Sequence, residues 1–144
     1  MNASDNSNHA IKGSCLCGAV VYEIYPPFSK FAHCHCARCR KASGAAHATN
    51  IYLEPPQLKW LSGREDVARF ELPTARSFAR WFCLHCGSAV PRLSRSGRTV
   101  VVPAGSLDED PREMPRARIF CESETSWACR GDDITRYAEY PDWW

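Results

Sequence analysis

The chain has 144 residues, the length of one domain of ordinary size, with 44% hydrophobic and 24% charged residues, as in an average globular protein. This composition excludes a disordered or fibrous chain, and the absence of an apolar run of 18 or more residues predicts that no helix spans a membrane. The formal net charge of +2 is too small to indicate a nucleic-acid-binding protein.

The chain opens with a polar segment, residues 1–10, which we expect to be a flexible tail. This segment lacks the basic and apolar regions of a secretory signal, so the sequence predicts a cytoplasmic location. Residues 11–140 form the predicted domain, and residues 141–144 form an aromatic C-terminal tail. Because two tryptophans rarely remain free in water, we expect Trp143 and Trp144 to pack on the domain or on a neighbouring chain.

Strand patterns dominate the folded part of the chain. Residues 19–25 are rich in β-branched and aromatic side chains, and their alternation places Val20, Tyr22 and Ile24 on one face. Glycine and proline turns separate further strand-like runs, which are residues 31–35, 48–53, 58–61, 67–72, 76–83, 99–103 and 118–121. Short helical turns are predicted at residues 37–43 and 107–110. This pattern predicts a mainly β, small single domain of short antiparallel strands.

Nine cysteines in a chain without a secretory signal indicate metal binding rather than disulfides, because cytoplasmic thiols stay reduced. Seven of them fall into a C-x-C pair, a C-x-C-x-x-C triplet and a C-x-x-C pair, formed by Cys15, Cys17, Cys34, Cys36, Cys39, Cys83 and Cys86. Zn²⁺ binds thiolates tetrahedrally, so this spacing predicts zinc sites.

Seven thiols divide into four and three, and this division predicts two zinc ions per chain in sites of different kinds. A structural zinc has four protein ligands, whereas a catalytic zinc has three and keeps one position open. The two distant pairs can supply the closed site, through Cys15, Cys17, Cys83 and Cys86. The triplet Cys34, Cys36 and Cys39 would then hold a catalytic zinc, with a position left for water or a substrate thiol.

Each metal site has an alternative interpretation. The C-x-x-C pair could be a redox dithiol, and the triplet could be a second structural site closed by a histidine. In an extended segment His33 and His35 point away from the face that carries Cys34 and Cys36. His47 is therefore the local histidine that is harder to exclude as a fourth ligand.

Two cysteines stand apart from the clusters. We expect Cys121 and Cys129 to be small buried apolar residues, because free cysteine is among the most buried residue types. A late metal ligand or a redox thiol is the alternative for each.

Three cysteine motifs in this order resemble the glutathione-dependent formaldehyde-activating enzyme family, which includes centromere-protein-V-like domains. The similar segments are Gly13-Ser14-Cys15-Leu16-Cys17-Gly18, residues 34–40 followed by Ser43-Gly44, and Phe82-Cys83-Leu84-His85-Cys86-Gly87. Residues 105–108, Ile119-Phe120 and Trp127 also look like the later signature of the family. The resemblance spans about residues 11–140.

The resemblance implies a zinc-stapled β-tent fold, a structural zinc at the four paired cysteines and a catalytic zinc at Cys34, Cys36 and Cys39. The activity it implies is that of a carbon–sulfur lyase, which forms S-(hydroxymethyl)glutathione from formaldehyde and glutathione. Many members have histidine and lysine where this chain has Arg118 and Glu124. The charge reversal at Glu124 bears on glutathione recognition more than on zinc binding.

These observations predict a zinc-dependent lyase that acts on a small thiol adduct. The predicted binding partner is a small thiol, and we expect the protein to bind neither nucleic acid nor a membrane. The alternatives are a non-catalytic module with two structural zinc ions, and a thiol carrier or metal store. No general base is identified, with His35 and His47 as weak candidates. The thiol, the fourth ligand of the triplet and the presence of a homo-oligomer are left open by the sequence.

Overall fold

Alternating apolar residues near the start of the chain build the first sheet. In the computed structural model, which describes residues 9–128 and 134–144, β1 (Ile11–Ser14) and β5 (Leu58–Ser62) both pair antiparallel with β2 (Val21–Ile24). Val20, Tyr22 and Ile24 are fully buried. The predicted face is therefore confirmed.

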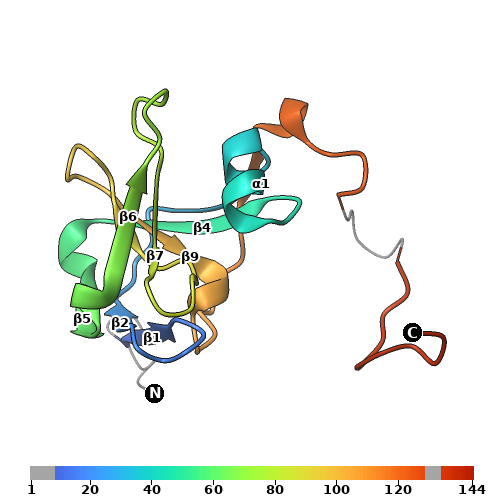
Figure 1. Ribbon diagram of the computed structural model, residues 1–144, viewed down its shortest axis with the longest axis horizontal. Helices are drawn as coiled ribbons and strands as arrows, with labels where there is room; N and C mark the ends of the chain where they lie inside the picture. The colour runs from blue at the N-terminus through green and yellow to red at the C-terminus, as the bar shows by residue number, and fades with distance from the viewer. Residues whose placement is uncertain (1–8, 129–133) are drawn as a thin grey trace, which may run out of the picture.

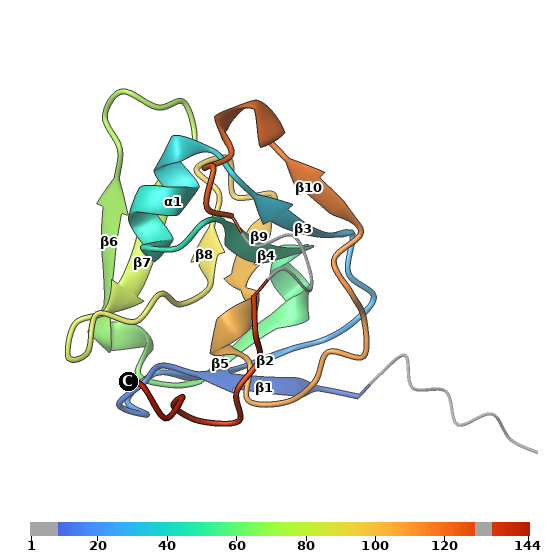
Figure 2. The ribbon, with the colours of Figure 1, turned by 90° about the vertical axis from the view of Figure 1, so that its right-hand side faces the viewer.

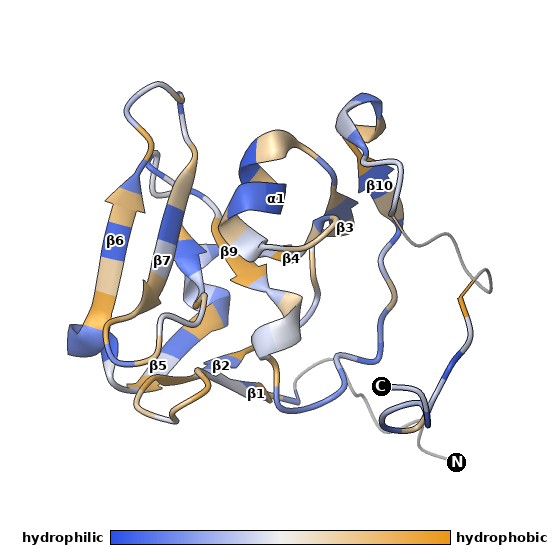
Figure 3. Cartoon of the chain, turned by 45° about the vertical axis from the view of Figure 1, so that its right-hand side comes forward, coloured by the Kyte–Doolittle hydropathy of each residue, from blue (hydrophilic) through white to orange (hydrophobic). Residues whose placement is uncertain are grey.

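A five-stranded sheet forms the second layer, in the order β10-β3-β4-β9-β8. Its strands are β3 (Lys30–Cys34), β4 (Ala48–Leu53), β8 (Arg92–Leu93), β9 (Val100–Pro103) and β10 (Ala117–Ile119). The helix α1 (Ala37–Ser43) connects β3 to β4 and lies at the end of the molecule opposite β1 and β2 (Figures 1 and 2). β9 is hydrophobic along most of its length (Figure 3), since it lies inside the sheet with both faces covered.

A two-stranded ribbon, β6 (Val67–Glu71) with β7 (Ala79–Cys83), stands beside these sheets (Figure 1). Single 3-10 turns complete the described elements, at η2 (Pro55–Gln57), η3 (Arg64–Asp66), η4 (Ala104–Ser106) and η5 (Cys121–Ser123). The predicted fold class is confirmed: the chain is a mainly β, small single domain of short strands. One pair departs from the antiparallel rule, because β10 runs parallel to β3.

The core has two parts. The larger cluster lies between the first two sheets and contains Tyr22, Ile24, Phe31, Ile51, Leu53, Val100 and Val102. The smaller cluster contains Val20 and Val90 packed with Cys15 and Cys83, so two of the paired cysteines are themselves core residues. The four-cysteine group is thus built into the packing where the ribbon meets the first sheet.

Several local predictions were wrong. The strands β1 and β8 were not predicted, because β1 contains glycine and β8 has only two residues. Both are strands through pairing, β1 with β2 and β8 with β9. Residues 107–110 are not a helical turn: the turn is η4, and Leu107 instead forms a bridge with Gly13. The strand predicted at 76–83 begins at Ala79, and that predicted at 118–121 ends at Ile119.

The aromatic C-terminal residues do not pack on the domain. Trp143 and Trp144 are 74% and 80% exposed, and their ring contacts are with each other and with Tyr140. Packing on a neighbouring chain stays a prediction. None of the helices in the described part of the chain has the length and apolar character that a bilayer crossing requires.

Gly13 provides a test of this packing. A Cβ at this position would overlap the buried Tyr22 ring, so Gly13→Ala is expected to lower the free energy of unfolding by about 1–3 kcal/mol. Gly105→Ala is the control, because a Cβ there meets no atom within 4 Å. Urea denaturation of both variants measures the difference, and equal midpoints would contradict the close approach of β1 to Tyr22.

Candidate metal centres and the adjoining cleft

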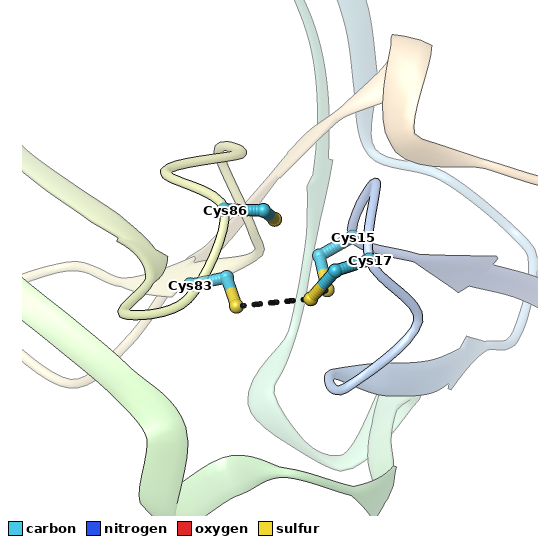
Figure 4. Close-up of side chains that lie close together, drawn as sticks. All are labelled: Cys15, Cys17, Cys83 and Cys86. Carbon is cyan, nitrogen blue, oxygen red and sulfur yellow. Dashed lines mark hydrogen bonds between the residues drawn. The ribbon is translucent and has the colours of Figure 1, made fainter.

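Four thiols from two distant turns meet beside the smaller core cluster (Figure 4). Cys15 and Cys17 lie in the turn between β1 and β2, while Cys83 ends β7 and Cys86 lies in the turn that follows. The Sγ atoms of Cys15 and Cys17 are 3.6 Å apart, and those of Cys17 and Cys83 are 3.8 Å apart. All four sulfurs lie within 4.8 Å of one another.

This arrangement fits a tetrahedral metal ion. Metal–sulfur bonds of ~2.3 Å require sulfur–sulfur edges of about 3.8 Å, close to the two distances above. Backbone N–H groups turn toward sulfur, from Val20 to Cys15 Sγ at 3.3 Å and from His85 to Cys83 Sγ at 3.4 Å. Such hydrogen bonds favour the thiolate, the form that binds a metal.

Cys86 is the thiol most strongly prepared for ionisation. Hydrogen bonds from the Ser88 hydroxyl, from the Ser88 backbone and from the Cys17 backbone lower the pKa of Cys86 to about 5. Gly87 directly follows it with φ of 74°, a left-handed conformation that glycine adopts at little cost and that this tight turn requires.

The turn that carries Cys86 is held in place from outside the cluster. Asp66 Oδ1 lies 3.2 Å from His85 Nε2, and the Asp66 carbonyl accepts a hydrogen bond from the Leu84 N–H at 2.8 Å. Since Asp66 precedes β6, the four-thiol cluster connects the first sheet to the β6–β7 ribbon.

Three thiols form a second cluster between β3 and α1. Cys34 ends β3, Cys36 caps the N-terminus of α1, and Cys39 lies in its first turn. Their sulfurs lie within 4.8 Å of one another, and Cys36 Sγ accepts the Cys39 N–H at 3.3 Å. Among the residues that the structure describes, no histidine or carboxylate joins this group.

The three thiols differ in the effects that act on their ionisation. Burial, and then the neighbouring thiols, raise the pKa of Cys39 far above its usual value. Burial also acts on Cys36, but hydrogen bonds that begin with the Cys39 backbone outweigh it and lower the pKa of Cys36. A divalent cation would therefore relieve the repulsion between three thiolates, of which those of Cys34 and Cys39 are buried.

Two residues that the sequence analysis missed face this cluster. Burial lowers the pKa of Arg92, while the charges of Tyr52 and Cys39 oppose that change. Burial and the charges of Cys34 and Cys39 raise the pKa of Tyr52. No motif marks either residue, because β4 and β8 bring them to the cluster only after the sheet has formed.

The three histidines near the triplet do not join the thiols in the described structure: the His47 ring lies against those of His33 and His35 at tilted angles. The His47 ring lies 4.2 Å from that of His33 and 5.0 Å from that of His35, measured between centroids. His33 Nδ1 lies 2.8 Å from Thr49 Oγ1. Burial, followed by the charge of His47, lowers the pKa of both His33 and His35.

The two departures from the family pattern contact each other. An ion pair joins the Arg118 guanidinium to the Glu124 carboxylate, and Arg118 Nε donates to His35 Nε2 at 3.4 Å. The negative charge of Glu124, which stands where many family members have a lysine, therefore pairs with the positive charge of Arg118.

The prediction of burial for the two cysteines outside the clusters can be checked for Cys121 alone. Cys121 is exposed in η5, so the expectation that it is a buried apolar residue is wrong. Its Sγ lies 3.5 Å from the Arg118 carbonyl, and it joins neither cluster. Cys129 lies outside the described residues.

A cleft of about 780 Å³ lies beside the four-thiol cluster, and a separate, narrow apolar cavity of about 90 Å³ lies beside Cys39. Cys15 lines the cleft and Cys39 lines the narrow cavity. The two spaces share the lining residues Ala42, Ser43, Ala48, Asn50, Arg80, Ala89 and Pro103. The narrow cavity that Cys39 lines and the cleft are therefore neighbours with common walls.

Arg80 spans the distance between the clusters. One Nη group donates to the Ala42 carbonyl in α1, and the other donates to the Gly87 carbonyl at 3.2 Å. Ala42 lies in the same helix as Cys39, and Gly87 directly follows Cys86. The same side chain thus holds both cysteine-bearing segments against the cleft.

The fold and these clusters define a small β domain with two thiol sites able to hold metal ions, consistent with zinc. The chain belongs to the glutathione-dependent formaldehyde-activating enzyme family, whose model matches residues 10–123. A Rhodobacter sphaeroides protein of known crystal structure is similar, with 26% sequence identity and a TM-score of 0.59 over 75% of this chain and 98% of that one. No curated protein matches the sequence.

Removing one thiol from each cluster tests the division into two sites. Cys83→Ser is expected to lose one metal equivalent and to lower the melting temperature strongly, because Cys83 is also a fully buried core residue. Cys36→Ser is expected to lose the other equivalent with a smaller change in melting temperature.

Elemental analysis and circular dichroism measure both properties on each variant. Cys121→Ser is the control, since this exposed thiol joins neither cluster. Loss of both metal equivalents in Cys36→Ser would contradict two independent sites.

Proposed function

We propose that the chain is a zinc-dependent carbon–sulfur lyase that acts on a small thiol adduct, of the type that forms S-(hydroxymethyl)glutathione. One observation carries the proposal: a cluster of three thiols, without a fourth protein ligand in the described residues, borders through Cys39 a cavity that shares its walls with an open cleft. The family to which the chain belongs supports the same chemistry.

Cys34, Cys36 and Cys39 would hold the catalytic zinc. A zinc ion with three protein ligands supplies a Lewis acid and an open position that lowers the pKa of a bound thiol. In the synthetic direction, a bond forms between the thiol sulfur and the aldehyde carbon, and the thiol proton ends on the aldehyde oxygen. In the lyase direction the same carbon–sulfur bond breaks and that proton returns.

The side chains around the cavity have distinct parts in this scheme. Ala48, Val90 and Val101 give the narrow cavity an apolar lining, which keeps bulk water from the reacting carbon. Arg92 favours the thiolate form of Cys39 through its positive charge. Asn50 lines both spaces and offers an amide N–H to the aldehyde oxygen, on which negative charge develops.

Cys15, Cys17, Cys83 and Cys86 would hold a structural zinc, giving two zinc ions per chain. Four thiolates complete a tetrahedron and leave no position for a substrate. The partner of the protein is then a small thiol, with glutathione as the thiol in the family description. We place the reaction in the cytoplasm, where thiols stay reduced.

A second candidate is a non-catalytic module in which both zinc ions are structural. The observation that favours it is the position of the triplet, which caps α1 through Cys36 and includes two buried thiols, Cys34 and Cys39. In that case both metal ions would resist a mild chelator. The lyase proposal instead expects the metal at the triplet to leave first, because it has three protein ligands and borders the cavity that Cys39 lines.

Thiol–aldehyde turnover tests the proposal directly. Zinc-loaded protein is expected to accelerate the condensation of formaldehyde with a small thiol above the spontaneous rate, monitored by loss of free thiol. Cys39→Ser is expected to reduce the enzymatic rate at least ~100-fold, because it removes a ligand of the open site. Cys121→Ser is expected to retain the wild-type rate.

The chelator experiment accompanies the rate measurement. A wild-type protein that loses one of two zinc ions to a mild chelator, and with it the turnover, supports the lyase. Rates that never exceed the spontaneous reaction across a panel of thiols would refute it.

A further inference from the structure

The outer edge of β6 is open. In the described part of the chain β6 pairs with β7 alone, and it lies at the margin of the molecule (Figures 1 and 2). The edge of β1 is covered by contrast, because Leu107 bridges Gly13 and the Asp108 N–H donates to the Lys12 carbonyl at 2.8 Å. An open edge presents main-chain groups that can pair with another strand.

The hydrogen bonds of the ribbon show which residues of β6 face this edge. The Leu72 N–H donates to the Phe78 carbonyl at 3.1 Å, and no register shift interrupts the pairing of β6 with β7. Main-chain groups of successive residues point to opposite sides of a strand, so those of Phe70, two residues before Leu72, also point to β7. The N–H and C=O groups of Arg69 and Glu71 therefore point to the open edge.

The side chains of β6 carry opposite charges on one face and an apolar ring on the other. Arg69 and Glu71 share a face, because side chains alternate along a strand. The Arg69 guanidinium lies 4.2 Å from the centre of the Trp81 ring, and Glu71 Oε2 lies 3.5 Å from Arg95 Nε. A carboxylate in such a pair keeps further acceptor positions. Phe70 points to the other face and is 52% exposed.

These features restrict how two copies of β6 can pair in antiparallel fashion. A register centred on Arg69 places like charges opposite each other, which is destabilising. A register centred on Leu72 places Glu71 opposite Pro73, which has no N–H to donate. In the register centred on Phe70, Arg69 of each copy lies opposite Glu71 of the other, and their outward main-chain groups exchange hydrogen bonds.

The same register also covers the exposed ring. The two Phe70 side chains then form a pair without main-chain hydrogen bonds, the kind of pair in which side chains approach most closely. Aromatic pairs across strands add to the stability of a sheet. Charge, hydrogen bonding and apolar contact therefore favour one register, in which the strand is complementary to itself.

We propose that β6 pairs with β6 of a second copy of this chain, antiparallel and centred on Phe70. The two ribbons then form one continuous sheet across a two-fold axis, the commonest symmetry of homodimers. A ribbon of two strands is marginally stable by itself, and a longer sheet stabilises it. This inference is independent of the proposed function, because none of the clustered thiols lies in β6.

Charge reversal at the edge tests the pairing in the full-length, zinc-loaded protein. The wild-type protein is expected to sediment as a dimer in analytical ultracentrifugation. Arg69→Glu and Glu71→Arg each place like charges opposite each other on both sides of Phe70. Each single variant is therefore expected to raise the dissociation constant of the dimer at least ~10-fold.

The two single variants are complementary to each other. A mixture of Arg69→Glu with Glu71→Arg is expected to form a heterodimer, because every charge then lies opposite its counter-charge. The double variant, which exchanges the two charges, is expected to dimerise again. Arg136→Glu is the matched control with an unchanged dissociation constant, since Arg136 is exposed in the C-terminal segment, on the side of the molecule opposite β6 (Figure 1).

Amide hydrogen exchange supplies a second measurement that needs no variant. As the wild-type protein is concentrated, exchange of the Arg69 and Glu71 amides is expected to slow at least ~10-fold, because pairing removes them from water. The Phe70 amide is the internal control, since its N–H points to β7 in the monomer and in the dimer alike.

Three outcomes would overturn the proposal. The first is a wild-type protein that stays monomeric, and the second is a dimer that both single variants leave intact. The third is a mixture of the two variants that gives no heterodimer although the wild-type protein dimerises. If a variant folds poorly, unchanged exchange of the Arg69 and Glu71 amides in a wild-type dimer overturns the proposal by itself.

Discussion

The joining of two turns through four thiols is the interaction on which the rest of the structure depends. Cys17 and Cys83 are 66 residues apart in the chain, yet their sulfurs lie 3.8 Å apart. A domain of short strands, in sheets of three, five and two, has few local contacts to hold such segments together. Because a metal binds thiolates only when they are gathered, its binding free energy becomes folding free energy.

This tie also shapes the cleft. The turn that carries Cys86 includes Gly87 and Ser88, which line the cleft together with Cys15 and Leu16 from the opposite turn. Arg80 then links Gly87 to the helix that contains Cys39. The four-thiol cluster therefore forms one wall of the cleft beside the cavity that Cys39 lines, and a structural metal would support the proposed reaction without meeting the substrate.

Charge around the three-thiol cluster is arranged by residues from separate elements. Arg92 from β8 acts on Cys39, whereas Arg118 from β10 is directed toward His35 and Glu124. Arg118 and Glu124 look like two independent departures from the family pattern in the sequence. In the folded chain the two charges compensate each other, because Arg118 and Glu124 form an ion pair. The parallel pairing of β10 with β3 also places Arg118 beside His35.

The sequence by itself determined the class of the fold, the limits of α1 and β4, and the membership of both thiol clusters. It could do so because β-branched periodicity is local and because tetrahedral zinc requires four close thiols wherever they lie in the chain. Only the tertiary structure decided that β1 is a strand, that Cys121 is exposed, that Asp108 and Arg80 line the cleft, and that Arg92 lines the narrow cavity. These features depend on contacts between segments distant in the chain, such as Ser14 with Asp108, which no local pattern of residues encodes.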